Sequence, residues 1–181
     1  MASSGIPALD NLLADGYPDK SAILVIGPPG IGKEALGYWF TGSGLIQGDF
    51  CLYVTRLSVK EVLKQNAGRR VRIVIDAISS LLMLNQPETI YRFLTQLFAD
   101  VKGYDAVLLA TLEEGMHKPE VVAAMQQLFD GVVELRLYEE GLRVLPLLRI
   151  RKMRGVPPQP GYFNFAFTRT GMELTSYGKQ S

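Results

Sequence analysis

Short apolar runs alternate with segments of helical periodicity along roughly the first 130 residues. Apolar runs of about four to eight residues are typical of strands buried between layers of helices. The pattern predicts four such strands, at residues 22–26, 50–55, 71–75 and 106–111. It predicts helices at residues 32–42, 87–101 and 119–129, and a turn or two of helix at 59–63. This order favours a mainly parallel sheet covered by helices.

The predicted helix 87–101 carries a stripe of apolar side chains at helical spacing. The stripe consists of Ile90, Phe93, Leu94, Leu97 and Phe98. We expect these side chains to pack on the sheet rather than to hold a ligand.

The sequence pattern changes after Gly131: the apolar runs are now separated by short polar turns instead of helical segments. The predicted strands lie at 132–137, 143–150, 162–167 and 172–174. Gly141 and Gly171 lie in the turns, which indicates antiparallel hairpins. We find no internal repeat and no linker that separates two domains. Residues 1–181 are therefore expected to form one α/β domain, a parallel core extended by antiparallel C-terminal strands.

Composition is that of an ordinary folded protein, with 48% apolar and 20% charged residues and a net charge of +1. Such a balance provides no global electrostatic attraction to nucleic acid or to a membrane surface. The single cysteine, Cys51, cannot form an internal disulfide and is expected to be a small core residue. No signal peptide and no membrane-spanning run is visible, so we expect a cytoplasmic protein without a membrane partner.

A glycine-rich loop with a lysine lies between the first predicted strand and the helix that follows it. It consists of Gly27, Pro28, Pro29, Gly30, Ile31, Gly32 and Lys33. Glycines allow several backbone N–H groups to converge on one point, and the helix directs its positive end to that point. A lysine then adds a full charge for the outer phosphates. The segment therefore predicts a P-loop (Walker A) that binds the phosphates of a nucleotide; an unliganded turn is the alternative.

Two carboxylates are candidates for holding Mg²⁺ beside those phosphates. The residue after Lys33 is Glu34, although P-loops place Ser or Thr there to bind magnesium. A carboxylate is a legitimate magnesium ligand, but it also adds negative charge beside a polyphosphate. Asp76 ends an apolar strand, where sites of this kind place their magnesium carboxylate.

Five segments resemble a KaiC-type ATPase domain of the RecA superfamily, in that family's order. They are residues 5–13, 27–33, 72–82, 130–135 and 151–155. The resemblance implies a RecA-like core that binds ATP or ADP and assembles with copies of itself or with related KaiC/RecA-like subunits. It also implies that Lys152 and Arg154, within the Lys-Met-Arg-Gly segment, contact the terminal phosphate in a neighbouring subunit.

The residues themselves support that role in part, because Lys152 and Arg154 belong to a compact basic cluster at a strand end, suited to an anion. A solvated basic strand end is the alternative. Nucleic acid is a further alternative, but no aromatic residues are interleaved in the cluster to stack on bases.

The sequence departs from the family where hydrolysis would be catalysed. After the second strand, active members of the family have a segment similar to Phe-Glu-Glu, whereas this chain has Arg56, Leu57 and Ser58 there. The carboxylates that would activate water are absent there, and the connection that follows is short. Hydrolysis needs a positioned base or water-orienting group as well as charge stabilisation.

Weak substitutes for that base follow the fourth strand, at Glu113 and Glu114; a solvated acidic loop is the alternative interpretation. Thr111, at the end of that strand, is a candidate sensor of the phosphate. The single histidine, His117, cannot build a multi-histidine metal site.

The sequence thus predicts a protein that binds ATP or ADP, hydrolyses it weakly or not at all, and uses nucleotide occupancy to control assembly or partner binding. Three alternatives stay open: an active ATPase with relocated carboxylates, a recombinase paralogue in DNA repair, and a structural protein with a vestigial loop.

Overall fold

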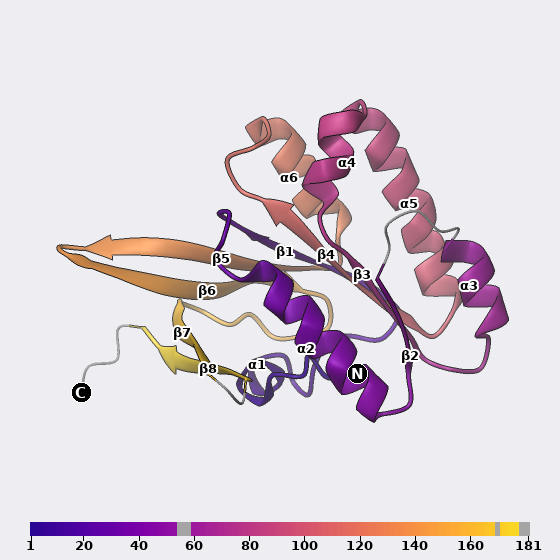
Figure 1. The fold of residues 1–181 in the computed structure, drawn as a ribbon, viewed down its shortest axis with the longest axis horizontal. Helices are drawn as coiled ribbons and strands as arrows, with labels where there is room; N and C mark the ends of the chain where they lie inside the picture. The colour runs from indigo at the N-terminus through magenta and orange to yellow at the C-terminus, as the bar shows by residue number, and fades with distance from the viewer. Residues whose placement is uncertain (54–58, 169–170, 178–181) are drawn as a thin grey trace.

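The computed structural model describes residues 1–53, 59–168 and 171–177 (Figure 1). Its strands form one sheet in the order β2-β3-β4-β1-β5-β6-β7-β8. The strands are β1 Ser21–Gly27, β2 Phe50–Tyr53, β3 Val71–Ile75, β4 Ala106–Glu113, β5 Gly131–Glu140, β6 Arg143–Met153, β7 Phe163–Thr168 and β8 Gly171–Ser176. The helices are α1 Pro7–Leu12, α2 Lys33–Ile46, α3 Val59–Gln65, α4 Ile78–Leu84, α5 Pro87–Gly103 and α6 Pro119–Leu128.

Strands β2, β3, β4, β1 and β5 are parallel, and β5 to β8 follow one another in antiparallel pairs. This confirms the predicted parallel core and its antiparallel extension. Each predicted strand is present, although residues 54–55 of the second one lie outside the described part of the chain. Strand β4 lies between β1 and β3, so their carboxyl ends meet at one edge of the sheet.

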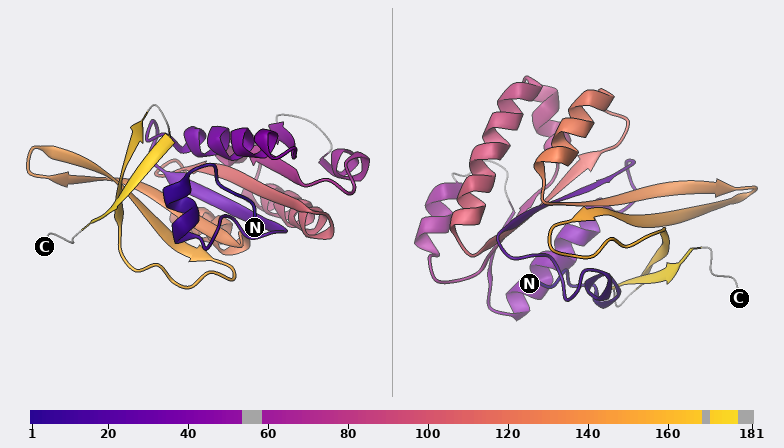
Figure 2. Two further views of the ribbon diagram at one scale, coloured as in Figure 1. Left: turned by 90° about the horizontal axis from the view of Figure 1, so that it is seen from below. Right: turned by 180° about the vertical axis from the view of Figure 1, so that it is seen from behind.

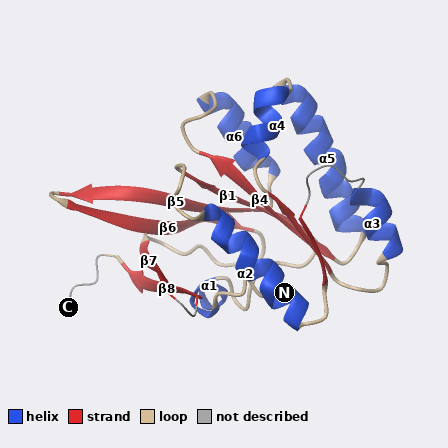
Figure 3. Ribbon diagram, in the orientation of Figure 1, coloured by secondary structure: helices blue, strands red, loops and turns tan. Residues whose placement is uncertain are grey.

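Helices cover both faces of the parallel strands, with α1 and α2 on one side and α3 to α6 on the other (Figure 3). Each side has its own apolar core against the sheet. None of the described helices combines the length and the apolar character needed to cross a bilayer.

Three local predictions need correction. Helix α2 continues to Ile46 rather than ending near residue 42, and the short helices α1 and α4 were not predicted. Cys51 is only half-buried; its thiol lies 3.3 Å from the carbonyl oxygen of Thr41, and burial raises its pKa.

In the stripe of α5, four of the five expected side chains are buried, but Phe93 is 45% exposed. Phe93 lies on one flank of the stripe. Phe98, on the other flank, is covered by Phe129 at 4.7 Å between ring centroids. The helical period predicted which face of α5 is buried. It could not predict that another element covers the side of this face with Phe98 and leaves the side with Phe93 exposed.

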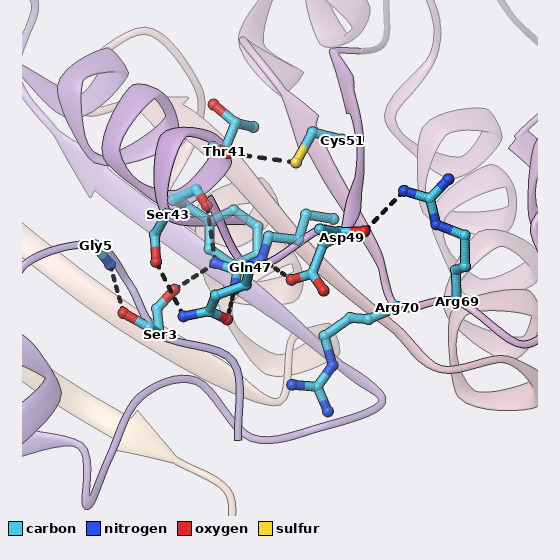
Figure 4. Close-up of polar contacts among 12 residues, drawn as sticks. Ser3, Gly5, Thr41, Ser43, Gln47, Asp49, Cys51, Arg69 and Arg70 are labelled. Atoms are coloured by element: carbon cyan, nitrogen blue, oxygen red, sulfur yellow. Dashed lines mark hydrogen bonds and ion pairs between the residues drawn. The ribbon is translucent and has the colours of Figure 1, made fainter. Parts of the chain in front are cut away.

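A fully buried arginine, Arg72, is the second residue of β3, and its partners Ser3, Gln47 and Asp49 are labelled in Figure 4. Its guanidinium donates to the carboxylate of Asp49 at 2.7 Å and to the amide oxygen of Gln47 at 2.8 Å. It also donates to the carbonyl oxygens of Ser3 and Phe40 at 2.6 and 2.8 Å. A buried charge is tolerated when it is paired and hydrogen-bonded in this way. Arg72 therefore ties the N-terminal segment and the end of α2 to the sheet.

Candidate phosphate-binding site

The candidate phosphate loop connects β1 to α2, as predicted, with Gly27 ending the strand and Lys33 beginning the helix. Gly32 has a φ of 94°, a left-handed conformation that favours glycine. A Cβ at Gly32 would also lie 2.3 Å from the ring of Phe167 in β7. Gly30 has a φ of 74°, and a Cβ there would have no atom within 4 Å, so its backbone is open to the approach of a ligand.

Lys33 is 2% exposed and points back toward the loop. Its ammonium donates to the carbonyl oxygen of Pro28 at 2.8 Å and forms an ion pair with the carboxylate of Glu113, also at 2.8 Å. Glu113 ends β4 and stands opposite Gly27 in the sheet register. Its backbone N–H donates to the hydroxyl of Ser79 at 2.9 Å, which ties the strand end to α4. The lysine thus has an internal counter-anion.

The two candidate bases after β4 have different surroundings. Glu113 contacts Lys33, whereas the exposed Glu114 is one of the negative charges that raise the pKa of Arg136 in β5. The backbone N–H of Glu114 donates to the carbonyl oxygen of Gly27 at 2.9 Å. Side chains of consecutive residues in an extended chain point in opposite directions, which separates the two carboxylates. His117 lies beyond this strand end and is not among the groups that contact Lys33.

Asp76 and Thr111 meet at the same edge of the sheet. Thr111 is buried in β4, and its hydroxyl donates to the exposed carboxylate of Asp76 at 2.5 Å. The edge therefore collects a lysine, two carboxylates and a hydroxyl from the ends of the adjacent strands β3 and β4 and from the first turn of α2. This is the edge at which parallel sheets bind their ligands.

Glu34 is exposed in the first turn of α2, on the side where Tyr53 ends β2. The pKa of Tyr53 is raised mainly by burial, and then by the nearby groups Tyr38, Asp76 and Glu34. The carboxylates of Asp76 and Glu34 therefore both act on one tyrosine. Their oxygen atoms fit the preference of Mg²⁺. Within the described residues, however, no cluster of three or more His, Cys, Asp or Glu side chains gathers to hold a metal.

Lys152 and Arg154 lie at the opposite edge of the sheet, because β6 runs antiparallel to β5. Lys152 donates to the carbonyl oxygen of Gln127 at 3.2 Å. Arg154 donates to the carboxylate of Asp130 at 3.1 Å and to the carbonyl oxygens of Asp19 and Lys20, both at 3.0 Å. These side chains cannot reach a phosphate held by Lys33 of the same chain. Their contact with a neighbour's phosphate stays a prediction.

Phe167 is a site neighbour that sequence reasoning missed. It is 44% exposed, covers Gly32 and contacts Trp39 of α2 at 5.6 Å between ring centroids. The strand that carries Phe167 was predicted, but the contact joins distant parts of the chain and has no local signal.

The strand order and the strand–loop–helix unit at this edge are those of a RecA-like α/β fold. Residues 2–70 match the family described as "ATPase: KaiC". Residues 58–135 match one described as "Family of unknown function (DUF7504)". A KaiC-like protein from Pyrococcus horikoshii shares the fold, with a TM-score of 0.77 over 96% of this chain and 97% of that chain, at 19% identity. The chain thus has the fold of a KaiC-like protein, and residues 2–70 resemble the KaiC ATPase family.

Curated relatives match over shorter stretches. The chain is 40% identical over 53 residues to a UPF0273 protein from Methanopyrus kandleri, which covers 29% of this chain and 21% of that protein. It is 33% identical over 66 residues to one from Pyrococcus furiosus, which covers 36% of this chain and 27% of that protein. The matches therefore span about a fifth to a quarter of these two relatives.

Proposed function

We propose that this chain binds ATP or ADP at the loop 27–33 and that occupancy of the loop controls its assembly or its binding of a partner. The observation that carries the proposal is the buried ammonium of Lys33, which lies beside the left-handed glycines and the carboxyl ends of β3 and β4. A buried ammonium needs an anion. Glu113 supplies it within the chain. A terminal phosphate would supply it in the nucleotide complex.

Glu113 then sets the affinity of the site. A polyphosphate that reaches Lys33 must either displace the Glu113 carboxylate or lie beside it, and two anions repel each other at that distance. Asp76 and Glu34 would hold Mg²⁺, which neutralises phosphate charge when bound. We therefore expect nucleotide binding to depend more strongly on Mg²⁺ than in a P-loop without such carboxylates.

Hydrolysis is proposed to be weak or absent. Arg56, Leu57 and Ser58, which replace the family's carboxylates, lie outside the described residues. Nucleotide occupancy would act on assembly through Lys152 and Arg154, each of which must leave its present carbonyl partners to reach a neighbour's phosphate. The partners would be further copies of this chain or related KaiC/RecA-like subunits.

A second candidate function is an active ATPase that uses Glu113 as its base. The observation in its favour is the position of the Glu113 carboxylate, 2.8 Å from the lysine that would hold the terminal phosphate. Released from Lys33 by the phosphate, this carboxylate would lie close enough to accept a proton from attacking water.

The test is a titration of ATP and of ADP, each with and without Mg²⁺, followed by a phosphate-release assay. Lys33→Ala is the binding-defective variant, and Lys118→Ala, an exposed lysine beyond the loop, is its matched control. Circular dichroism establishes that each variant is folded. Absence of nucleotide binding by the folded native chain would refute the proposal. Phosphate release no faster than in Lys33→Ala would refute the ATPase alternative.

Mass measurement tests the effect on assembly. We expect the oligomeric state to change on addition of nucleotide in the native chain but not in Lys33→Ala. A chain that stays monomeric in both would overturn the roles of Lys152 and Arg154 across a subunit interface.

A further inference from the structure

The antiparallel hairpin β5–β6 projects beyond the helices, so one face of it is left uncovered next to α6 (Figures 1 and 2). On this face, Glu134 stands opposite Arg149, and Tyr138 stands opposite Leu145. The alternate residues, such as Leu135, belong to the core beneath α1 and α2. Because side chains alternate across a strand, the open face is the one that carries Glu134, Arg136 and Tyr138.

Two arginines of this face lie against one tyrosine. The guanidinium carbons of Arg149 and Arg136 lie 4.9 and 5.6 Å from the ring centroid of Tyr162. Arg136 also donates to the Tyr162 hydroxyl at 2.9 Å. Tyr162 immediately precedes β7, in a part of the chain distant from both arginines. The tertiary structure therefore places an aromatic ring against Arg149 of the basic cluster, although no aromatic residue is interleaved in that cluster along the sequence.

A cleft of about 510 Å³ is lined by Arg149, which contacts Tyr162, and by Gly161, the residue before that tyrosine. One wall carries Arg149, Arg151 and Lys152 of β6, and the other is the proline-rich segment 156–161. Within the described part of the chain, Arg151 forms no ion pair and no side-chain hydrogen bond. The cleft therefore presents an uncommitted cation beside two others, which suits a phosphate group.

A second aromatic group lies farther along the hairpin. Tyr138 is 44% exposed and contacts Tyr177 edge-on, with 5.8 Å between ring centroids. The spacing of aromatic rings along an open sheet face, flanked by cations, is the arrangement on which unpaired bases stack.

The charges of this face favour an anionic ligand. Glu134 is 4% exposed and is neutralised by Arg149, at 2.6 Å from its Nη2 atom. Glu140 lies near Tyr177, and Glu114 near Arg136. Neither Glu140 nor Glu114 lines the cleft, and within the described residues Arg151, which does line it, has no acidic partner.

We propose that this face binds single-stranded nucleic acid, with phosphates held by Arg136, Arg151 and Lys152 and with bases stacked on Tyr138 and Tyr162. A duplex would fit poorly because its bases are already stacked on one another and cannot lie flat on the tyrosine rings. The face is separate from the loop that holds Lys33, so binding does not depend on that loop. Lys152 is shared with the proposed contact to a neighbour's phosphate.

Fluorescence anisotropy with labelled oligo(dT), oligo(U) and a duplex, each of about 16 nucleotides, tests the proposal over a range of salt concentrations. We expect both single strands to bind at least about tenfold more tightly than the duplex, and their relative affinities to show whether DNA or RNA is preferred. Replacing Arg151 with alanine removes one phosphate contact, so the salt slope should fall by about 0.7. Tyr138→Leu should weaken binding by about fivefold to 100-fold.

Three controls separate the proposal from simpler explanations. Tyr162→Phe keeps the ring and should retain more binding than Tyr162→Leu, because stacking needs the ring and not the hydroxyl. Arg92→Ala removes an exposed cation of α5 and should leave binding unchanged. Lys33→Ala should abolish nucleotide binding but retain the single strand.

The proposal is overturned if the single strands do not bind, or if the duplex or heparin binds as tightly as they do, which would indicate attraction to any polyanion. It is also overturned if Arg151→Ala and Tyr138→Leu bind like the native chain, since the contact would then lie elsewhere.

Discussion

Breaking the ion pair between Lys33 and Glu113 should lower the stability of the nucleotide-free protein but raise its affinity for nucleotide. Replacing Glu113 with glutamine keeps the shape of the side chain but removes its charge. Breaking a buried ion pair costs about 3–5 kcal/mol when one charge is left without a partner. Here the carboxylate is 24% exposed and Lys33 keeps its bond to the Pro28 carbonyl, so we expect a smaller loss. A destabilisation of about 1–3 kcal/mol follows for the nucleotide-free protein.

Nucleotide affinity should move the other way. A phosphate that reaches Lys33 in Glu113→Gln no longer competes with a carboxylate, so about 1–2 kcal/mol of repulsion and displacement disappears. This corresponds to roughly a fivefold to 30-fold lower Kd for ATP or ADP. The variant should therefore melt at a lower temperature than the native chain without nucleotide, and should gain more from its addition.

Calorimetric titration and thermal melting with and without nucleotide measure both effects. The matched control is Glu114→Gln, because the Glu114 carboxylate acts on Arg136 rather than on Lys33. If a folded Glu113→Gln variant binds nucleotide no more tightly than Glu114→Gln does, then Glu113 does not compete with phosphate. If its phosphate release also stops, the role of Glu113 is that of a base.

Three further predictions concern other parts of the fold. Gly32→Ala should lower the free energy of unfolding by about 1–3 kcal/mol, because its φ of 94° is strained for alanine and the new Cβ would lie 2.3 Å from Phe167; a melting temperature equal to the native one would contradict this account. Arg72→Leu should cost about 3–5 kcal/mol by chemical denaturation, since the Asp49 carboxylate, which is 11% exposed, loses its partner, whereas the exposed Arg69→Ala should cost under about 1 kcal/mol. Burial raises the pKa of Cys51 and therefore favours the neutral thiol. Because iodoacetamide reacts with the thiolate, it should modify Cys51 more slowly than a free thiol at the same pH, and the full rate should be reached only at higher pH. Equal rates in native and unfolded protein would refute this.

Local patterns in the sequence predicted most elements of the fold. The strand–loop–helix unit around Lys33 and the hairpin of β5 and β6 depend on residues close together in the chain, so periodicity and turn residues were sufficient. The helices α1 and α4 escaped prediction because short helices depend on tertiary packing more than on propensity. In α4, for example, Ile78 and Leu82 are buried in the core beneath α5.

The candidate site was only partly accessible to the same reasoning. The sequence identified Lys33, Asp76 and the loop glycines from their places at strand and helix ends. It did not find Phe167 against Gly32, nor the bonds of Arg72 to the N-terminal segment and to the end of α2, because these contacts join residues far apart in the chain.

The sequence by itself determined a P-loop-like turn between a buried strand and a helix, with acidic residues available nearby. Only the tertiary structure decided that Glu113, rather than its neighbour Glu114, pairs with Lys33. Likewise, only the tertiary structure brought Tyr162 against Arg136 and Arg149. The physical reason is that strand order and register determine which side chains meet across a sheet, and a shift of one residue would turn each side chain to the other face.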